Sequence, residues 1–281
     1  MNDTCEPLLI NAVRELPVLP AAVLELLDML GRDDVETSEL VARISLDQAL
    51  TAKTLRLANS SFYGMPRHVA SVTDATTVLG LRTVRAVVTA AALAGSFKPP
   101  ACKGFDFMAF WRHAVNTAVS ARLVAAEVGA DSDAAFTAGL LHDIGQLVLA
   151  SAFPERFAVV LAHRAEADIA LRDAELALLG IDHATVGASV AERWRFPQAI
   201  VEVIGDHHTP RACATAFALV RIVHVADHLA RVLEHGAGGG DVPLATCHGA
   251  WTELGLPAEA WARIVAEAEL QTQILCAALL T

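Results

Sequence analysis

The sequence predicts an all-α protein, and three observations support this prediction. Alanine, leucine and valine dominate a chain of 281 residues that is 54% hydrophobic, whereas tyrosine occurs once and phenylalanine ten times, and this composition favours helix over sheet. Glycine and proline interrupt the apolar segments at regular intervals, as they do between helices. No segment shows the strict alternation of apolar and polar residues that is typical of a half-buried strand.

The first hundred residues contain several helix starts and are expected to form an N-terminal helical bundle. Thr37 or Ser38 is expected to cap one helix, and Ser71 with Asp74 forms the S-x-x-D pattern of a capping box at the start of another. Helices are expected over residues 20–30 (from Pro20 to a stop at Gly31), 39–45, 46–58, 72–79 and 81–94.

A second helical subdomain is expected after Pro99-Pro100, because this dipeptide and the loop ACKG break the helical pattern. We therefore place the boundary near residue 100, between a subdomain over 1–100 and one over 101–281. The glycine-rich stretch 235–243 is expected to be a flexible surface connection. Further helices are expected over approximately 106–128, 133–144, 154–167, 172–179, 182–195, 197–206, 215–234 and 257–279.

Charge and composition argue against several classes of function. The formal net charge of −11 disfavours nucleic acid as the main partner, since phosphate binding needs a basic surface. The mean hydropathy of +0.44 is high, yet no stretch without a charged residue exceeds about a dozen residues, against the roughly 20 that a membrane span needs. The start of the chain lacks the pattern of an export signal, so a cytoplasmic location is expected. The cysteines are scattered and odd in number, which argues against disulfides and a cysteine zinc site (Cys5, Cys102, Cys213, Cys247, Cys276).

His142 and Asp143 stand side by side in the apolar segment AFTAGLLHDIGQLVLASAF, residues 135–153. Burial of a polar group without a partner costs several kcal/mol, and burial of a bare charge costs more. Two explanations are open. Either the two side chains satisfy each other and a neighbouring backbone group, or a cation lies between them.

Other imidazoles and one carboxylate fall on apolar helix faces. His183 shares a stripe with Val186 and Val190, and Asp227 shares one with Val220 and Val223. Imidazole and carboxylate ligands suit Fe, Mn, Zn or Ni, and we expect one or two divalent ions, although histidines hydrogen-bonded to the backbone and to one another are the alternative. The candidate ligands are His113, His142, Asp143, His183, His207, His208 and Asp227.

Two smaller signals lie close to these residues. Glu175 precedes the segment GIDH by one short helix, and we expect it to be a solvated helix-face residue, with support of a ligand histidine as the alternative. His224 and His228 flank Asp227, and one of them is a candidate partner that hydrogen-bonds the ligands from outside.

The order of these residues resembles the HD superfamily of metal-dependent phosphohydrolases, in particular the branch with an HD-GYP-type ligand order. The chain as a whole resembles still more closely the HDOD proteins, the HD-related output domains of bacterial signalling, over about residues 15–235. The matching segments are LPVLPAAVLELLDML, ISLDQALTAKTLRLANSSFYG, SVTDATTVLGLRTVRAVV, GLLHDIGQLVL, LGIDHATVGASVAERWRFPQAI, HHTP and IVHVADHLA. The resemblance implies an N-terminal bundle packed on an HD-like helical bundle.

The two resemblances imply different functions. HDOD proteins are generally regarded as regulatory or scaffold modules, and many have lost the HD ligands, whereas this sequence keeps nearly all of them. It departs from the active HD-GYP pattern at Gln146, where a lysine is expected, at Ala109, where a carboxylate is expected, and in lacking a GYP segment. Asp143 and Gln146 are thus the residues nearest the expected chemistry, and the loss of the lysine removes a charge that could stabilise a transition state.

Three hypotheses follow, in order of preference. The first is a bacterial signal-transduction module that acts through contacts with a signalling protein and retains its metal. The second is a metal-dependent phosphohydrolase that acts on a cyclic nucleotide, a dinucleotide or another phosphoester. The third is a helical interaction domain without metal. The sequence does not determine the oligomeric state.

Overall fold

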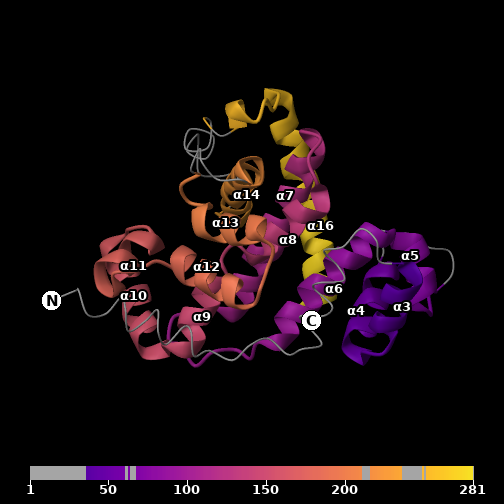
Figure 1. Ribbon diagram of the computed structural model, residues 1–281, viewed down its shortest axis with the longest axis horizontal. Helices are drawn as coiled ribbons and strands as arrows, with labels where there is room; N and C mark the ends of the chain where they lie inside the picture. The colour runs from indigo at the N-terminus through magenta and orange to yellow at the C-terminus, as the bar shows by residue number, and fades with distance from the viewer. Residues whose placement is uncertain are drawn as a thin grey trace.

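The computed structural model of the chain describes residues 36–60, 63, 68–210, 216–235, 249 and 251–280. Within these ranges every regular element is an α-helix, so the predicted all-α class is confirmed (Figure 1). The helix expected over 20–30, most of the glycine-rich stretch, and Cys5, Cys213 and Cys247 lie outside the described residues.

The helices follow the expected pattern, and most of their ends lie within a few residues of the expected positions. They are α3 (Thr37–Ser45), α4 (Gln48–Ala58), α5 (Val72–Leu79), α6 (Leu81–Ser96), α7 (Phe107–Glu127), α8 (Ser132–Leu141), α9 (Ile144–Ala152), α10 (Pro154–Ala167), α11 (Leu171–Leu179), α12 (His183–Arg193), α13 (Gln198–Asp206), α14 (Phe217–His235) and α16 (Ala258–Leu279).

Side-chain caps explain where several helices begin. The oxygen of an Asp or Ser just before the helix accepts backbone N–H groups that have no partner within the first turn. Such caps are Asp47 (α4), Ser71 (α5), Asp106 (α7), Asp131 (α8) and Asp182 (α12).

The cap expected for α3 is wrong. Thr37 and Ser38 lie inside the first turn of α3, and the capping position belongs to Glu36, whose side chain accepts no backbone hydrogen bond there. The Ser38 hydroxyl donates instead to the Glu36 carboxylate at 3.2 Å. A hydroxyl within the turn is thus used by a neighbouring side chain rather than by the helix backbone.

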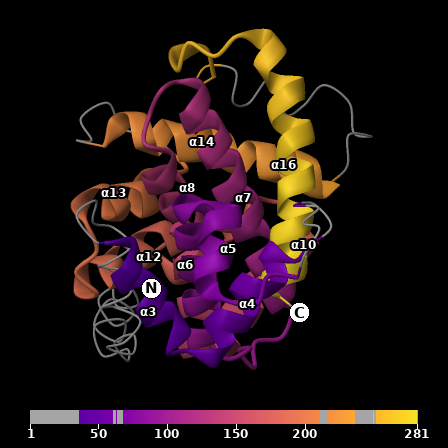
Figure 2. The ribbon, with the colours of Figure 1, turned by 90° about the vertical axis from the view of Figure 1, so that its right-hand side faces the viewer.

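Helices α3 to α6 pack on one another at one side of the molecule (Figure 1). The loop with Pro99 and Pro100 follows α6, at the position where the sequence places a boundary. The long helix α16 returns from the end of the chain and packs on α4, α6 and α7, so it joins both parts of the described structure (Figure 2). Its buried face includes Ile264, Ala268 and Leu275.

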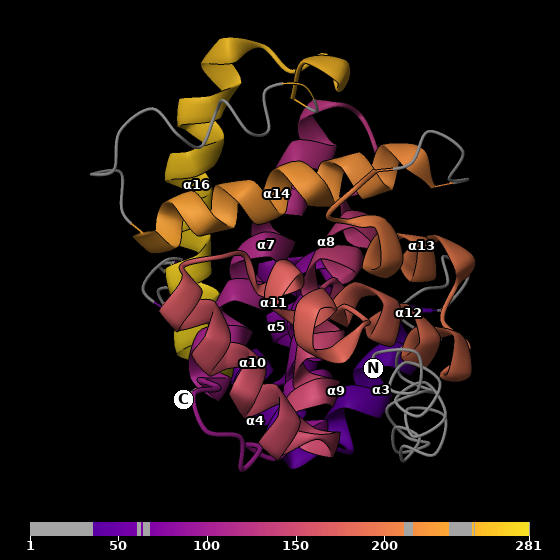
Figure 3. The ribbon, with the colours of Figure 1, turned by 90° about the vertical axis from the view of Figure 1, so that its left-hand side faces the viewer.

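Helix α7 forms the centre of the second part. It packs on α8, α14 and α16, and α14 crosses it as a long diagonal helix (Figure 3). Asn116 of α7 donates to the carbonyl of Ala230 in α14 at 3.2 Å and accepts a hydrogen bond from Thr272 of α16 at 3.3 Å. These two contacts fix α7, which carries His113, relative to both partner helices.

The expectation of one continuous helix over 133–144 is wrong at its C-terminal end. Helix α8 stops at Leu141, and a separate helix α9, which the sequence pattern does not predict, begins at Ile144. Asp143 has φ −98° and ψ 11°, which turns the chain, and its side chain does not cap α9. The turn therefore leaves the carboxylate of Asp143 available to face other side chains.

Among the described residues, no single helix is both long and apolar enough to cross a membrane, and two bent helix pairs meet these criteria only when each pair is taken together. Within the same residues Cys102 and Cys276 are free thiols.

Candidate metal centre

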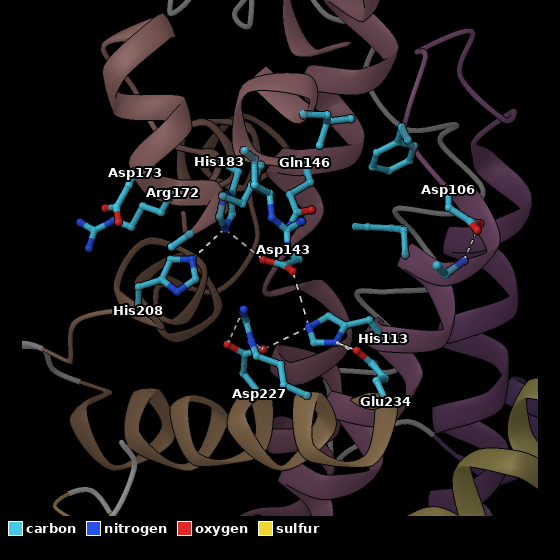
Figure 4. A pocket seen from close by; sticks show the side chains of 18 of the residues that line it. Asp106, His113, Asp143, Gln146, Arg172, Asp173, His183, His208, Asp227 and Glu234 are labelled. Atoms are coloured by element: carbon cyan, nitrogen blue, oxygen red, sulfur yellow. Dashed lines mark hydrogen bonds and ion pairs between the residues drawn. The ribbon is translucent and has the colours of Figure 1, made fainter. Parts of the chain in front are cut away.

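The structure brings all seven candidate ligands together from five parts of the fold (Figure 4). His113 comes from α7 and Asp227 from α14. His142 and Asp143 occupy the turn between α8 and α9. His183 is the first residue of α12, and His207 and His208 follow the end of α13.

Asp143 lies at the centre of this cluster and is only 3% exposed. Its Oδ1 atom lies 3.1 Å from Nε2 of His183 and 3.5 Å from Nε2 of His207. Its Oδ2 atom lies 3.3 Å from Nε2 of His142 and 3.7 Å from Nε2 of His113. Four imidazoles therefore direct the same ring nitrogen toward one carboxylate.

Two of these imidazoles are held by the backbone of their own helix. Nδ1 of His142 donates to the carbonyl of Gly139 at 2.7 Å, and Nδ1 of His207 donates to the carbonyl of Ile204 at 2.9 Å. When Nδ1 carries the proton, Nε2 of a neutral ring carries a lone pair. Unless a proton or another cation lies at Nε2, both rings therefore direct an electron pair toward Asp143.

His183 is held by a buried glutamate. Nδ1 and the backbone N–H of His183 both donate to Oε2 of Glu175, at 2.6 and 2.9 Å. Glu175 is fully buried, so the expectation that it is a solvated residue is wrong. Glu175 instead supports a candidate ligand histidine, because a carboxylate behind the ring fixes the orientation of the imidazole and raises its basicity as a ligand.

His113 is held by Glu234, a residue that the sequence analysis did not single out. Nδ1 of His113 lies 2.9 Å from Oε1 of Glu234, and its Nε2 lies 3.1 Å from Oδ1 of Asp227. Asp227 in turn accepts two hydrogen bonds from Arg231, one on each carboxylate oxygen, at 2.9 Å each. Asp227 is thus shared between an imidazole and a guanidinium.

Of the two histidines that flank Asp227, His224 is the one that hydrogen-bonds a candidate ligand residue from outside the cluster. Its Nδ1 donates to the backbone carbonyl of His207 at 2.7 Å, whereas Nδ1 of His228 donates to the carbonyl of His224 at 3.0 Å. His224 therefore supports the segment that carries His207 through the backbone of that segment.

The charges in the cluster are strongly coupled. Burial alone would raise the pKa of Asp143, but the imidazoles of His142, His183 and His207 outweigh burial and hold this pKa well below its ordinary value. Burial lowers the pKa of His208 to about 2, so this ring is neutral. For His113, burial would lower the pKa, but Asp227 and Glu234 raise it to about 10.

The donor set fits a cation better than a hydrogen-bonded cluster. Nε2 of His142 and Nε2 of His207 are buried and have no hydrogen-bond partner among the residues that the structure describes. Each faces a carboxylate, which is itself an acceptor, so two electron pairs oppose each other unless a positive charge lies between them. Nε2 of His208 also lies only 2.8 Å from Nε2 of His183. A divalent transition-metal ion would satisfy these atoms together.

The ligand atoms fall into two groups that share Asp143. The four-residue group contains Asp143, His183, His207 and His208, and the three-residue group contains His113, His142 and Asp143. Within each group, the atoms lie within 4.8 Å of one another. The assignment of individual residues as ligands stays a prediction.

Two glycines allow the helices that carry these residues to approach closely. A Cβ atom on Gly145 of α9 would lie 1.9 Å from the backbone oxygen of His183, and one on Gly187 of α12 would lie 2.7 Å from Cγ2 of Ile204. A side chain at either position would therefore separate α9, α12 and α13. The glycine of the HDIG segment places Asp143 next to His183.

A cavity of about 550 Å³ opens onto the cluster. Asp143, His183 and His208 line it, as do Ala109 and Gln146. Three arginines complete the lining on different helices or loops (Arg164, Arg172 and Arg231). A neutral amide and a methyl group thus stand where the phosphohydrolase pattern has an ammonium and a carboxylate, and the three guanidinium groups share the lining with five carboxylates (Asp106, Asp143, Asp173, Asp227 and Glu234).

Comparison with known proteins shows which family the chain belongs to. Residues 16–210 match the HDOD domain family. An uncharacterized protein of Treponema pallidum is 29% identical over 230 residues, which are 80% of this chain and 44% of that protein. The chain thus spans less than half of the length of this curated relative.

Solved structures show the same fold. A candidate phosphohydrolase from Shewanella amazonensis superposes with a TM-score of 0.80 at 29% identity, over 96% of this chain and 97% of that one. A candidate signal transduction protein from Marinobacter aquaeolei superposes with a TM-score of 0.78 at 26% identity, over 95% of this chain and 60% of that one.

Proposed function

This chain belongs to the HDOD domain family, and on that premise we propose that it is a bacterial signal-transduction module with a divalent metal centre. The centre holds one or two ions among the seven His and Asp side chains. The module acts through contacts with a signalling protein and turns over phosphoesters slowly or not at all. The similarity to a candidate signal transduction protein supports the signalling role.

One observation carries the metal centre. Four imidazoles direct Nε2 at the carboxylate of Asp143, and the Nδ1 atom of each one is occupied by a backbone carbonyl or a glutamate on its far side. Four protons at one buried carboxylate would leave a large excess of positive charge in a site of low polarity. One shared divalent ion would satisfy the same atoms with half of that charge, and two ions would carry no more charge than the four protons.

The residues around the centre favour binding over turnover. A bound divalent ion supplies Lewis acidity and lowers the pKa of a bound water. Turnover also requires fixed charge near the group that leaves, and Gln146 offers only a neutral amide at the cavity wall. The loss of one such stabilising group typically costs about 10²–10³ in rate. Ala109 offers no ligand four residues before His113.

A specific observation favours a second candidate function, that of a metal-dependent phosphohydrolase. The cavity reaches the cluster directly and is lined by three arginines, whose guanidinium groups suit phosphate oxygens. Arg172 and Arg231 also bind Asp182 and Asp227, and Arg164 is exposed at the cavity. A cyclic nucleotide, a dinucleotide or another phosphoester would thereby be placed beside Asp143. Similarity to a candidate phosphohydrolase supports this alternative.

Elemental analysis of the full chain, purified without chelator and then reconstituted with Mn²⁺, Fe²⁺ or Zn²⁺, tests the metal centre. We expect at least one tightly bound ion per chain and its loss in Asp143→Ala. A chain that binds none of these ions after reconstitution, or an Asp143→Ala variant that retains them, would contradict the proposal.

Turnover distinguishes the two candidate functions. The metal-loaded chain is assayed against cyclic dinucleotides, cyclic mononucleotides and a generic chromogenic phosphodiester. We expect little or no hydrolysis. Rates near typical enzyme values of about 1–10³ per second, abolished in Asp143→Ala, would replace the regulatory function with the phosphohydrolase.

A further inference from the structure

We propose that Arg172 is a positioning residue of the metal centre, because its guanidinium ties the segment that carries His183 to the segment that carries His208. This inference rests on the proposed metal centre. It gives Arg172 a role other than that of a phosphate ligand, although this residue lines the cavity together with both histidines (Figure 4). Arg172 acts through the residues next to the two histidines.

His208 is the candidate ligand whose ring is held least by hydrogen bonds. The other four imidazoles each have a partner at Nδ1, which is a backbone carbonyl or a glutamate. Within the described part of the chain, no such partner binds Nδ1 of His208, and its Nε2 lies 2.8 Å from Nε2 of His183. The position of this ring therefore depends on its contact with the ring of His207, at 4.0 Å between centroids, and on the backbone that follows α13.

Arg172 lies in the first turn of α11 and reaches both segments. Its Nε donates to Oδ2 of Asp182 at 2.8 Å, and one terminal nitrogen donates to Oγ1 of Thr209 at 3.3 Å. Asp182 directly precedes His183, and Thr209 directly follows His208. The donors of a guanidinium are fixed in one plane, so a single side chain sets the spacing between the two segments.

Asp182 is a firm anchor for this bridge. Its Oδ1 accepts the backbone N–H of Thr185 at 2.9 Å and the hydroxyl of the same residue at 2.6 Å, and this contact caps α12. Its Oδ2 is the atom that binds Arg172. The cap and the bridge thus use different oxygens. Loss of Arg172 would therefore release the backbone at Thr209 and leave the cap of α12 in place.

The possible roles of Arg172 predict different changes in metal affinity. A guanidinium near the centre repels a cation, so if charge alone mattered, a neutral replacement would tighten metal binding or leave it unchanged. A role as phosphate ligand predicts no change when phosphate is absent. Loss of a bridge would instead weaken binding, because His208 would no longer be held beside His183. The direction of the change therefore identifies the role.

Titration of the metal-free full chain with Co²⁺ in competition with a chelating dye, without phosphate, tests the inference. We expect Arg172→Gln to bind Co²⁺ about three- to tenfold more weakly than the wild type, which is less than the usual effect of losing a direct partner of a ligand. Arg172→Lys keeps the charge but lacks the planar donors, and it should also weaken binding. Arg164→Gln, which removes an exposed arginine of the same cavity, is the matched control and should change affinity less than about twofold.

Two further measurements separate the bridge from a general loss of stability. Thr209→Val removes only one end of the bridge. It should weaken Co²⁺ binding in the same direction and have no added effect in the Arg172→Gln background. The visible spectrum of bound Co²⁺ reports its ligands, and in Arg172→Gln it should shift toward the spectrum of His208→Ala. Circular dichroism of each variant checks that the helices are retained.

Several results would overturn the inference. These are wild-type or tighter Co²⁺ binding by Arg172→Gln, an unchanged spectrum in this variant, and additive effects of Arg172→Gln and Thr209→Val. If Arg172→Gln does not fold, the affinity and spectrum of Thr209→Val decide the question. A wild-type chain that binds no Co²⁺ would instead overturn the proposed metal centre, on which the inference depends.

Discussion

Gly145→Ala is the substitution whose effect the structure defines most closely. The added Cβ atom would lie 1.9 Å from the backbone oxygen of His183, whereas real Cβ contacts stay above 3.0 Å. Helices α9 and α12 must therefore separate by about 1 Å, because the obstructing atom is backbone and cannot rotate away. The distance between Asp143 and His183 would increase from 3.1 Å by a similar amount.

This separation is expected to lower both stability and metal affinity. Overpacking of a core typically costs about 1–3 kcal/mol, which corresponds to a decrease of roughly 2–12 °C in Tm for a protein of this size. Displacement of His183 from its position beside Glu175 is expected to weaken metal binding by about 10–100-fold, the usual effect of disturbing the support of a ligand.

Differential scanning calorimetry with chelator, followed by Mn²⁺ titration, separates the two effects, since bound metal itself raises Tm. Gly205→Ala in α13 is the matched control, because its Cβ would meet only Cβ of Ala188 at 3.4 Å. We expect this control to be neutral or stabilising by about 0.5–1 kcal/mol. A Gly145→Ala protein with the Tm and Mn²⁺ affinity of the wild type would refute the reasoning.

Three other predictions concern residues that orient a candidate ligand or cap the helices next to the site. Glu175→Gln should keep the fold, as judged by circular dichroism, but lower Mn²⁺ affinity by about 10–100-fold, while Glu155→Gln on the exposed side of α10 should not change it. Asp131→Ala removes the acceptor for two backbone N–H groups at the start of α8 and should cost about 1 kcal/mol in urea denaturation; an unchanged midpoint would contradict this. Burial would raise the pKa of Asp182, but hydrogen bonds from Thr185 and Arg172 lower it to about 2, below its unfolded value of about 3.9. Its contribution to stability is therefore present above about pH 4 and lost between about pH 4 and 2, and an Asp182→Asn variant with the same acid unfolding curve as the wild type would argue against it.

The helical pattern could be predicted from the sequence because glycine, proline and capping residues mark most helix ends. The break between α8 and α9 could not, because apolar residues continue on both sides of His142 and Asp143. The backbone turn at Asp143 results from packing of α9 against α12, which depends on a contact between Gly145 and His183 that sequence periodicity does not report.

The candidate ligands could be selected because charged and imidazole side chains on apolar faces are unusual. The residues that hydrogen-bond these candidate ligands were harder to predict from the sequence. Glu175 lies between Leu171 and Leu179 on one face of α11, and this apolar context was a signal of its burial. Glu234 follows Asp227 by seven residues, two turns along the same face of α14, yet only the structure shows that His113 lies against both.

The return of α16 to the first helices has a consequence for synthesis of the protein. Nζ of Lys53 in α4 donates to the carbonyl of Leu279 at the end of α16, across 226 residues of sequence. At about 5–20 residues per second, a ribosome needs on the order of 10–45 s to make the intervening chain. During that time the surfaces of α4, α6 and α7 that α16 covers remain exposed. The nascent chain therefore presents an apolar surface to chaperones until its last described helix has emerged.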